Sequence, residues 1–148
     1  MSITVGLTGS AETVVTDQNT AAALGSGSLP VFATPAMVAL METAAVAALE
    51  GHLDSCESSV GTQLEISHDA ASPVGISVRA EAEVVAVTGK AISFTVRCYD
   101  SFGVIGSGTH QRYIITVDRF LAKAAQRNQY AEREAFHMKE FLKNMKIS

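Results

Sequence analysis

This sequence has little cysteine, proline or tryptophan, and it lacks the short motifs of metal and nucleotide sites. It has no tryptophan, three prolines and two cysteines. Cys56 and Cys98 have no CxxC spacing and no neighbouring histidine cluster, so we expect free thiols and no metal site. No HExxH, GxSxG or P-loop pattern is present. The common metal-dependent, serine-hydrolase and nucleotide-binding motifs are therefore excluded.

Charge and hydropathy exclude further partners. The formal charge is −4, from 11 basic and 15 acidic residues, which gives no bulk attraction for nucleic acid. The longest apolar run, residues 29–41, is interrupted by Thr34 and Pro35 and closed by Glu42, so we expect no membrane insertion. Residues 1–10 lack the basic-then-apolar order of a secretory signal, which favours a cytoplasmic location.

What the sequence does have is one long apolar stretch, residues 31–51, with the spacing of a helix. Thr34 is the predicted N-cap, Pro35 suits the first helical position, and Gly51 suits the C-terminal stop. Because both faces are apolar, we expect this helix to be enclosed on nearly all sides. The predicted packing face contains Met37, Leu40, Met41, Ala44, Ala45 and Ala48.

Glu42 is the single charge in the middle of that helix. An unpaired carboxylate in apolar surroundings would cost on the order of several kcal/mol, so it must be hydrogen-bonded, have a raised pKa or open into a cleft. The functional hypothesis is a general base or nucleophile. The alternative is a structural carboxylate satisfied by a partner chain.

After residue 60 the hydrophobic period changes from 3.6 to 2. Strands are predicted at 60–71, 75–87, 91–99 and 104–117, after an earlier strand within 3–15, and the alternation places Val84 and Ala86 on one side. Gly106 and Gly108 indicate a bulge or a close backbone approach. A curved antiparallel meander wrapped around one apolar helix is the α+β hotdog fold.

The tail, residues 118–148, returns to helical spacing. It is predicted to be a packing or oligomer-contact helix, and a membrane-surface or partner-docking helix is the alternative. The expected domains are a hotdog domain, residues 1–128, and an amphipathic helical extension, residues 129–148. The predicted stripe consists of Ala131, Ala135, Met138, Phe141, Leu142 and Met145.

Two further residues are candidates for the site. Thr34 precedes Glu42 by eight residues, about 12 Å along a helix, so a direct contact needs an irregular first turn or a second subunit. His68 ends a predicted strand, and a lone strand histidine is more often structural than catalytic. His52 and His110 have weaker claims, and His137 is expected to be solvated.

Three segments resemble the hotdog acyl-CoA thioesterases related to fluoroacetyl-CoA thioesterase. They are VFATPAMVALMETAA, SVGTQLEISHDAASPVG and IGSGTHQRYII, and the resemblance spans residues 5–128. It implies that Thr34, Glu42 and His68 act together, that the Gly61 backbone N–H lies near the thioester carbonyl, and that Arg112 lines or gates the pocket. It also implies a homodimer or a dimer of dimers with the site at the subunit interface.

The sequence departs from that group at residues 25–30, GSGSLP, where the fluoroacetyl enzyme has a bulkier lid containing aromatic residues. The hypothesis is therefore hydrolysis of a short- or medium-chain acyl-CoA, with no cofactor other than the CoA of the substrate. One alternative is a hotdog enoyl-CoA hydratase, although the Asp and His that such enzymes draw from a loop before the helix are missing. The other is a non-catalytic module that binds acyl-CoA or a related ligand.

Overall fold

The computed structural model describes residues 1–147 and divides the chain into two compact units, Met1–Ile114 and Ile115–Ser148. The first unit contains almost all of the sheet, and the second contains the last helix. In chain order the elements are β1 (Thr8–Val14), α1 (Ala21–Leu24), α2 (Thr34–Leu49), β2 (Glu57–His68), β3 (Ser77–Thr88), β4 (Ala91–Asp100), β5 (Gly103–Thr116) and α3 (Val117–Ile147).

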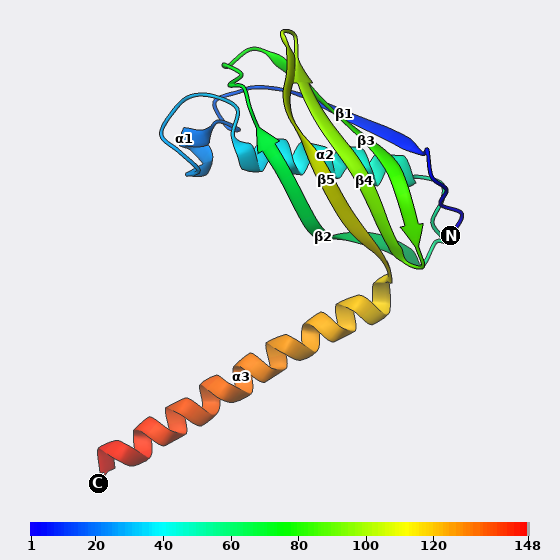
Figure 1. Cartoon of the computed structure of the whole chain (residues 1–148). Coiled ribbons are helices and arrows are strands. Elements are labelled where there is room, and N and C mark those ends of the chain that lie inside the picture. Colours follow the sequence, from blue (N-terminus) through cyan, green and yellow to red (C-terminus); the bar gives the residue numbers. More distant parts are fainter. Residues whose placement is uncertain (148) are drawn as a thin grey trace. The chain divides into compact units, whose positions relative to one another are not determined.

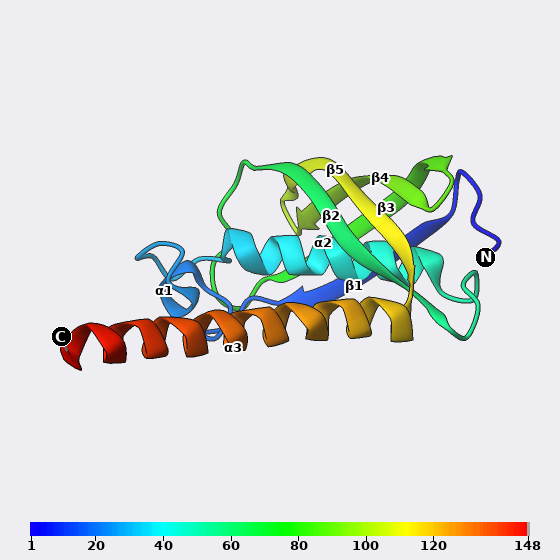
Figure 2. The ribbon, with the colours of Figure 1, turned by 90° about the horizontal axis from the view of Figure 1, so that it is seen from below.

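The five strands form one sheet in the order β1-β3-β4-β5-β2 (Figure 1). β3, β4 and β5 follow one another as an antiparallel meander, and β1 pairs antiparallel with β3 at one edge. β2 lies at the other edge, beside β5. The predicted meander is confirmed, and the sheet curls along α2 (Figure 2).

α2 packs its predicted face against this sheet. The six side chains that the helical spacing places on that face are each at most 9% exposed, namely Met37, Leu40, Met41, Ala44, Ala45 and Ala48. Full burial of a Leu, Met or Phe side chain contributes about 1.5–3 kcal/mol. The sheet supplies the alternating buried residues of β3 and β4, namely Val78, Ala80, Ala82, Val84, Ile92, Phe94, Val96 and Cys98.

The other side of α2 is not enclosed within a single chain. Ala39 is exposed and Val46 is 43% exposed, whereas Val38 and Ala47 are half-buried. The expectation of a helix covered on nearly all sides is therefore wrong for one chain, because the sheet reaches only one side of it. A strip of apolar surface remains along α2.

The two ends of α2 differ in how well the sequence predicted them. Ala33, not Thr34, is the N-cap, and it has an extended backbone and no side-chain capping bond. Thr34 is the first helical residue, and Pro35 follows in the first turn. Gly51 has a φ of +79° just beyond the helix, which confirms it as the stop.

The alternation of β3 breaks near its end. The register with β4 shifts between Val84 and Ala86, so Ala86 is exposed and Val87 packs against the core instead. The prediction that Ala86 shares the side of Val84 is wrong, because one extra residue in a bulge reverses the alternation beyond it.

Two glycines of β5 lie against the backbone of β2. A Cβ at Gly106 would overlap the carbonyl of Ser67, and one at Gly108 would overlap the backbone of Glu65 and Ile66. The predicted close approach is confirmed. It brings β2 tightly against β5 and so fixes where the side chains of β2 lie.

α3 is a single helix of 31 residues. The predicted helical tail is confirmed, and residue 128, the expected boundary of the hotdog domain, falls inside this helix. Among the residues described, no helix is long and apolar enough to cross a membrane.

Candidate active site

The first cluster of predicted site residues joins the start of α2 to the end of β2. Thr34 Oγ1 lies 2.7 Å from His68 Nδ1, a hydrogen-bond distance. Ala33 is the N-cap of α2, so the Thr34 hydroxyl is not used for capping and instead orients the His68 imidazole. The pair lines a pocket of about 250 Å³ whose other walls include Phe32 and Ser26.

His68 is half-buried in this pocket. Its Nε2 atom is buried and has no hydrogen-bond partner among the residues described. Burial lowers the pKa of His68 below its ordinary value. The imidazole is thus held at one nitrogen and left available at the other, as a group that exchanges a proton with a bound molecule must be.

The second cluster surrounds Glu42, in the middle of α2. Arg112 Nη1, from β5, lies 3.1 Å from Glu42 Oε2 and forms an ion pair with it. The Arg112 side chain is 7% exposed, whereas that of Glu42 is 40% exposed. Of the three outcomes expected for Glu42, the structure shows a hydrogen-bonded carboxylate, which Arg112 pairs on one side and solvent reaches on the other.

Arg112 is itself held from several directions. Its Nε donates to Ser59 Oγ at 2.8 Å and its Nη2 donates to the Ser59 carbonyl at 3.1 Å, both in β2. Its Nη1 also lies 3.1 Å from His110 Nε2. A guanidinium only donates, so His110 Nε2 must be the acceptor, and His110 Nδ1–H donates to the Gln63 carbonyl at 2.8 Å.

Arg112 therefore requires a neutral imidazole, and the Gln63 carbonyl fixes its proton on Nδ1. Burial lowers the pKa of His110, and the charge of Arg112 lowers it further. On sequence alone His110 had only a weak claim to a functional role, although the spacing in β5 contained a signal for one. His110 and Arg112 are two residues apart in one strand, so their side chains share a face.

Gly61 lies where any side chain would press on the Glu42 carboxylate. A Cβ at this position in β2 would stand 2.7 Å from Glu42 Oε2 and 3.2 Å from His110 Cε1. The absence of a side chain lets the carboxylate lie directly beside the strand backbone. The structure therefore brings Glu42, Gly61 and Arg112 together.

The two clusters remain separate within one chain. α2 is continuous from Thr34 to Leu49, so the irregular first turn that would bring Thr34 to Glu42 is not present. The eight-residue interval corresponds to about 12 Å along the helix. His68 accordingly meets Thr34.

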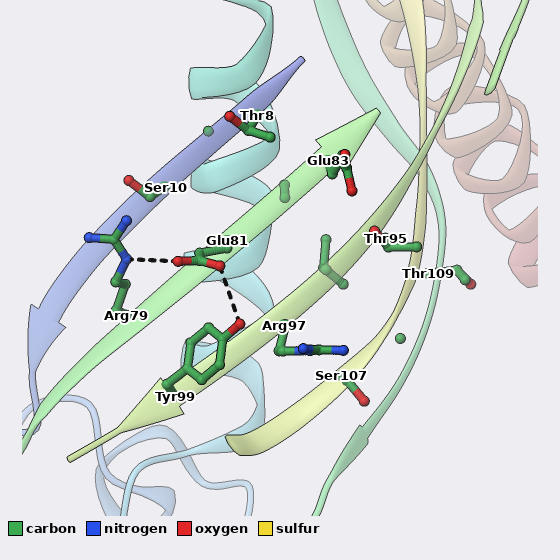
Figure 3. A pocket seen from close by; sticks show the side chains of 14 residues that line it. Thr8, Ser10, Arg79, Glu81, Glu83, Thr95, Arg97, Tyr99, Ser107 and Thr109 are labelled. Carbon is green, nitrogen blue, oxygen red and sulfur yellow. Dashed lines mark hydrogen bonds and ion pairs between the residues drawn. The ribbon is translucent and has the colours of Figure 1, made fainter. Parts of the chain in front are cut away.

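A larger hollow of about 740 Å³ lies on the face of the sheet opposite α2 (Figure 3). Its walls are polar, and Glu81 there accepts hydrogen bonds from Arg79 and Tyr99. None of the predicted site residues lines it.

Possible metal ligands and the two cysteine thiols are the other reactive groups in the part of the chain that the structure describes. No group of three or more His, Cys, Asp or Glu side chains there could hold a metal ion. Both cysteines are free thiols, as expected. Burial raises the pKa of Cys98 to about 11, which keeps its thiol protonated and unreactive at neutral pH.

Comparison with known proteins adds to this geometry. Residues 15–118 match the model of a family described as fluoroacetyl-CoA-specific thioesterase. The fluoroacetyl-CoA thioesterase of Streptantibioticus cattleyicolor is 43% identical over 97 residues, which are 66% of this chain and 70% of that protein.

Solved structures of thioesterases also resemble this chain in fold. A variant of the fluoroacetyl-CoA thioesterase FlK in complex with acetyl-CoA has a TM-score of 0.80 and 37% identity, over 84% of this chain and 98% of that one. A Thermus thermophilus protein described as a thioesterase superfamily member has a TM-score of 0.82 and 28% identity, over 88% and 97% of the two chains. The expected hotdog fold is thus confirmed, and the chain belongs to the fluoroacetyl-CoA-specific thioesterase family.

Proposed function

We propose that this protein hydrolyses acyl-CoA thioesters to a free acid and CoA. The observation that carries the proposal is the position of the Glu42 carboxylate. It is half-exposed, held by Arg112 and placed against the backbone at Gly61. A carboxylate that a cation orients and solvent can still reach is suited to attack a carbonyl carbon or to activate water.

Two routes lead to the same products. In one, Glu42 attacks the thioester carbonyl, the C–S bond breaks to give a mixed anhydride and CoA thiolate, and water then cleaves the anhydride. In the other, Glu42 takes a proton from a water molecule, which attacks the carbonyl directly. In both, the Gly61 N–H stabilises the oxyanion, protonated His68 gives its proton to the CoA thiolate, and a proton of the consumed water then returns to His68.

We infer that a second copy completes the site. Thr34 and His68 of one subunit would act with Glu42, Gly61 and Arg112 of the other. Two observations support this homodimer, namely the separation of the two clusters within one chain and the uncovered apolar strip of α2 at Ala39 and Val46. A dimer of dimers and a cytoplasmic location remain predictions from the sequence.

The acyl group is proposed to be short and apolar. The pocket beside His68 holds about 250 Å³ and is lined partly by Val31, Phe32 and Ala71. Ser26, from the GSGSLP segment, lies at its wall, where the sequence supplies no aromatic side chain. Acetyl-CoA, butyryl-CoA and fluoroacetyl-CoA are therefore the substrates to compare.

Replacing Glu42 tests the assignment. In Glu42→Gln and Glu42→Ala we expect kcat for acyl-CoA hydrolysis, measured by thiol release, to fall about 1000-fold, because the group that attacks or activates water is lost. The matched control is Glu50→Gln, which removes an exposed carboxylate at the end of the same helix.

Near-normal thiol release from a folded Glu42→Ala variant would refute the role of Glu42. A wild-type protein that binds acyl-CoA in calorimetry and releases no thiol would instead be a binding module, and the proposed activity would be wrong.

A further inference from the structure

One side of α3 carries a repeat that a helix packed on a globular surface does not need. The residues are spaced alternately four and three apart, which is the 3.5-residue period of a coiled coil, sustained over about four heptads. They are Val117, Leu121, Ala124, Asn128, Ala131, Ala135, Met138, Leu142 and Met145. We call these residues the α3 seam.

Several apolar side chains on this side of α3 are exposed. Leu121 and Met138 are each 58% exposed, Leu142 is 48% exposed, and the flanking Phe141 is 60% exposed. A helix of this length gains most of its stability from burying an apolar face. The exposed side chains of Leu121, Met138 and Leu142 therefore favour packing against a helix of matching period.

Charges beside the seam indicate which partner fits. With Leu121, Asn128, Ala135 and Leu142 at position a of the heptad, Arg127 and Glu134 occupy g, and Glu132 and Lys139 occupy e. In a parallel, in-register pair each g residue faces the e residue five positions further along the other helix. Arg127 then meets the partner's Glu132, and Glu134 meets the partner's Lys139.

Both of these pairings are attractive, and each occurs twice in a symmetric pair. An antiparallel pair aligned over the same residues would place g beside g and e beside e, and it would also bring opposite charges together, Arg127 with Glu134 and Glu132 with Lys139. The charges therefore fit a second copy of this helix, and Asn128 decides the direction, because in the antiparallel pair it would face Met138 instead of its equivalent. Asn128 is the only polar residue of the α3 seam, and a single asparagine at position a fixes register by facing its equivalent.

We propose that residues 117–145 of α3 form a parallel, in-register, two-stranded coiled coil with the same helix of a second copy of this chain. The family match ends at residue 118, so this helix lies almost entirely outside the part shared with the family. The proposal does not depend on the activity or on the way the catalytic clusters meet.

Cysteine cross-linking in the full chain tests the geometry. In a background with the exposed Cys56 changed to Ser, Ala131→Cys places a thiol at position d, where equivalent residues of a parallel pair face each other within disulfide distance. Mild oxidation should give a covalent dimer about 10-fold faster than in the control Arg133→Cys, which lies on the outer side of the helix. Equal cross-linking rates at residues 131 and 133, or no covalent dimer at either position, would overturn the proposal. Binding of the chain to anionic vesicles in place of cross-linking would also overturn it.

A charge exchange tests the orientation, with the Ala131→Cys cross-link as the readout. The double variants Arg127→Glu with Glu134→Lys, and Glu132→Lys with Lys139→Glu, each place like charges opposite one another in a parallel homodimer. Each alone should cross-link at least about 5-fold less, and a mixture of the two should recover the original yield as a heterodimer. Unchanged cross-linking in both double variants would exclude the parallel arrangement.

Discussion

Arg112 is a buried cation, and its hydrogen bonds explain how the fold tolerates it. A buried charge is costly unless it is paired and its polar atoms are satisfied. Here each of its three nitrogens has a partner, namely Ser59 for Nε and Nη2, and Glu42 and His110 for Nη1. The arginine thus fixes the carboxylate of Glu42 while the neutral imidazole of His110 fixes the arginine.

This arrangement predicts a loss of stability in acid. The unfolded chain protonates His110 near the ordinary pKa of about 6.5, whereas burial beside Arg112 lowers the pKa in the folded state. Below about pH 6.5 the unfolded state binds more protons, so stability is complete above that pH and is lost as the pH falls through the folded pKa.

Thermal unfolding followed at about pH 7.5 and about pH 5.5 measures this effect. In His110→Gln the amide oxygen can still accept from Arg112 and does not titrate, so the decrease in Tm on acidification should be smaller than in the wild type. His137→Gln, at an exposed position of α3, is the control. An undiminished pH dependence in His110→Gln would show that His110 is not responsible.

At the scale of elements, β1 is positioned by a glycine that faces α2. A Cβ at Gly9 would overlap the backbone of Ala44 and Ala48. Strand and helix therefore approach more closely here than any side chain would permit. This contact holds the edge strand over the half of α2 that follows Glu42.

Gly9→Ala should accordingly separate β1 from α2. We expect the free energy of unfolding to fall by about 1–3 kcal/mol, the usual cost of overpacking, as measured by chemical denaturation. Ser10→Ala, at the next and exposed position of the same strand, should change it by less than about 0.5 kcal/mol. Equal effects in the two variants would mean that β1 does not depend on this contact.

At the scale of the whole molecule, the separation of the two clusters of proposed site residues predicts that variants of two subunits can complement each other. If each site combines His68 of one subunit with Glu42 of the other, a heterodimer of Glu42→Ala and His68→Ala subunits contains one intact site and one doubly damaged site. The two homodimers contain none. This expectation separates a shared site from one confined to a single chain.

Co-expressing the two inactive variants in equal amounts should therefore restore about a quarter of the wild-type kcat, since about half of the dimers are mixed and each has one of two sites. Thiol release from acyl-CoA is the measurement, and each variant prepared alone is the control. If the mixture remains as inactive as its components, the site lies within one subunit.

Local sequence rules predicted the regular parts of the fold. The spacing of Met37 to Ala48 gave the packing face of α2, Gly51 gave its end, and the alternation of β4 gave its buried side. The bulge between Val84 and Ala86 was not predictable, because no glycine or proline marks it. The contact between the Thr34 hydroxyl and His68 was not predictable either, because a threonine at the start of a helix is locally a good N-cap.

By itself the sequence determined the long apolar helix, the meander that follows it and the presence of a carboxylate where an unpaired one would be costly. Each of these depends on periodicity or on the chemistry of one side chain. Only the tertiary structure decided that Glu42 pairs with Arg112 and that His68 meets Thr34. The physical reason is that these contacts join residues far apart in the chain, and the register of β2 and β5 against α2 selects which of them meet.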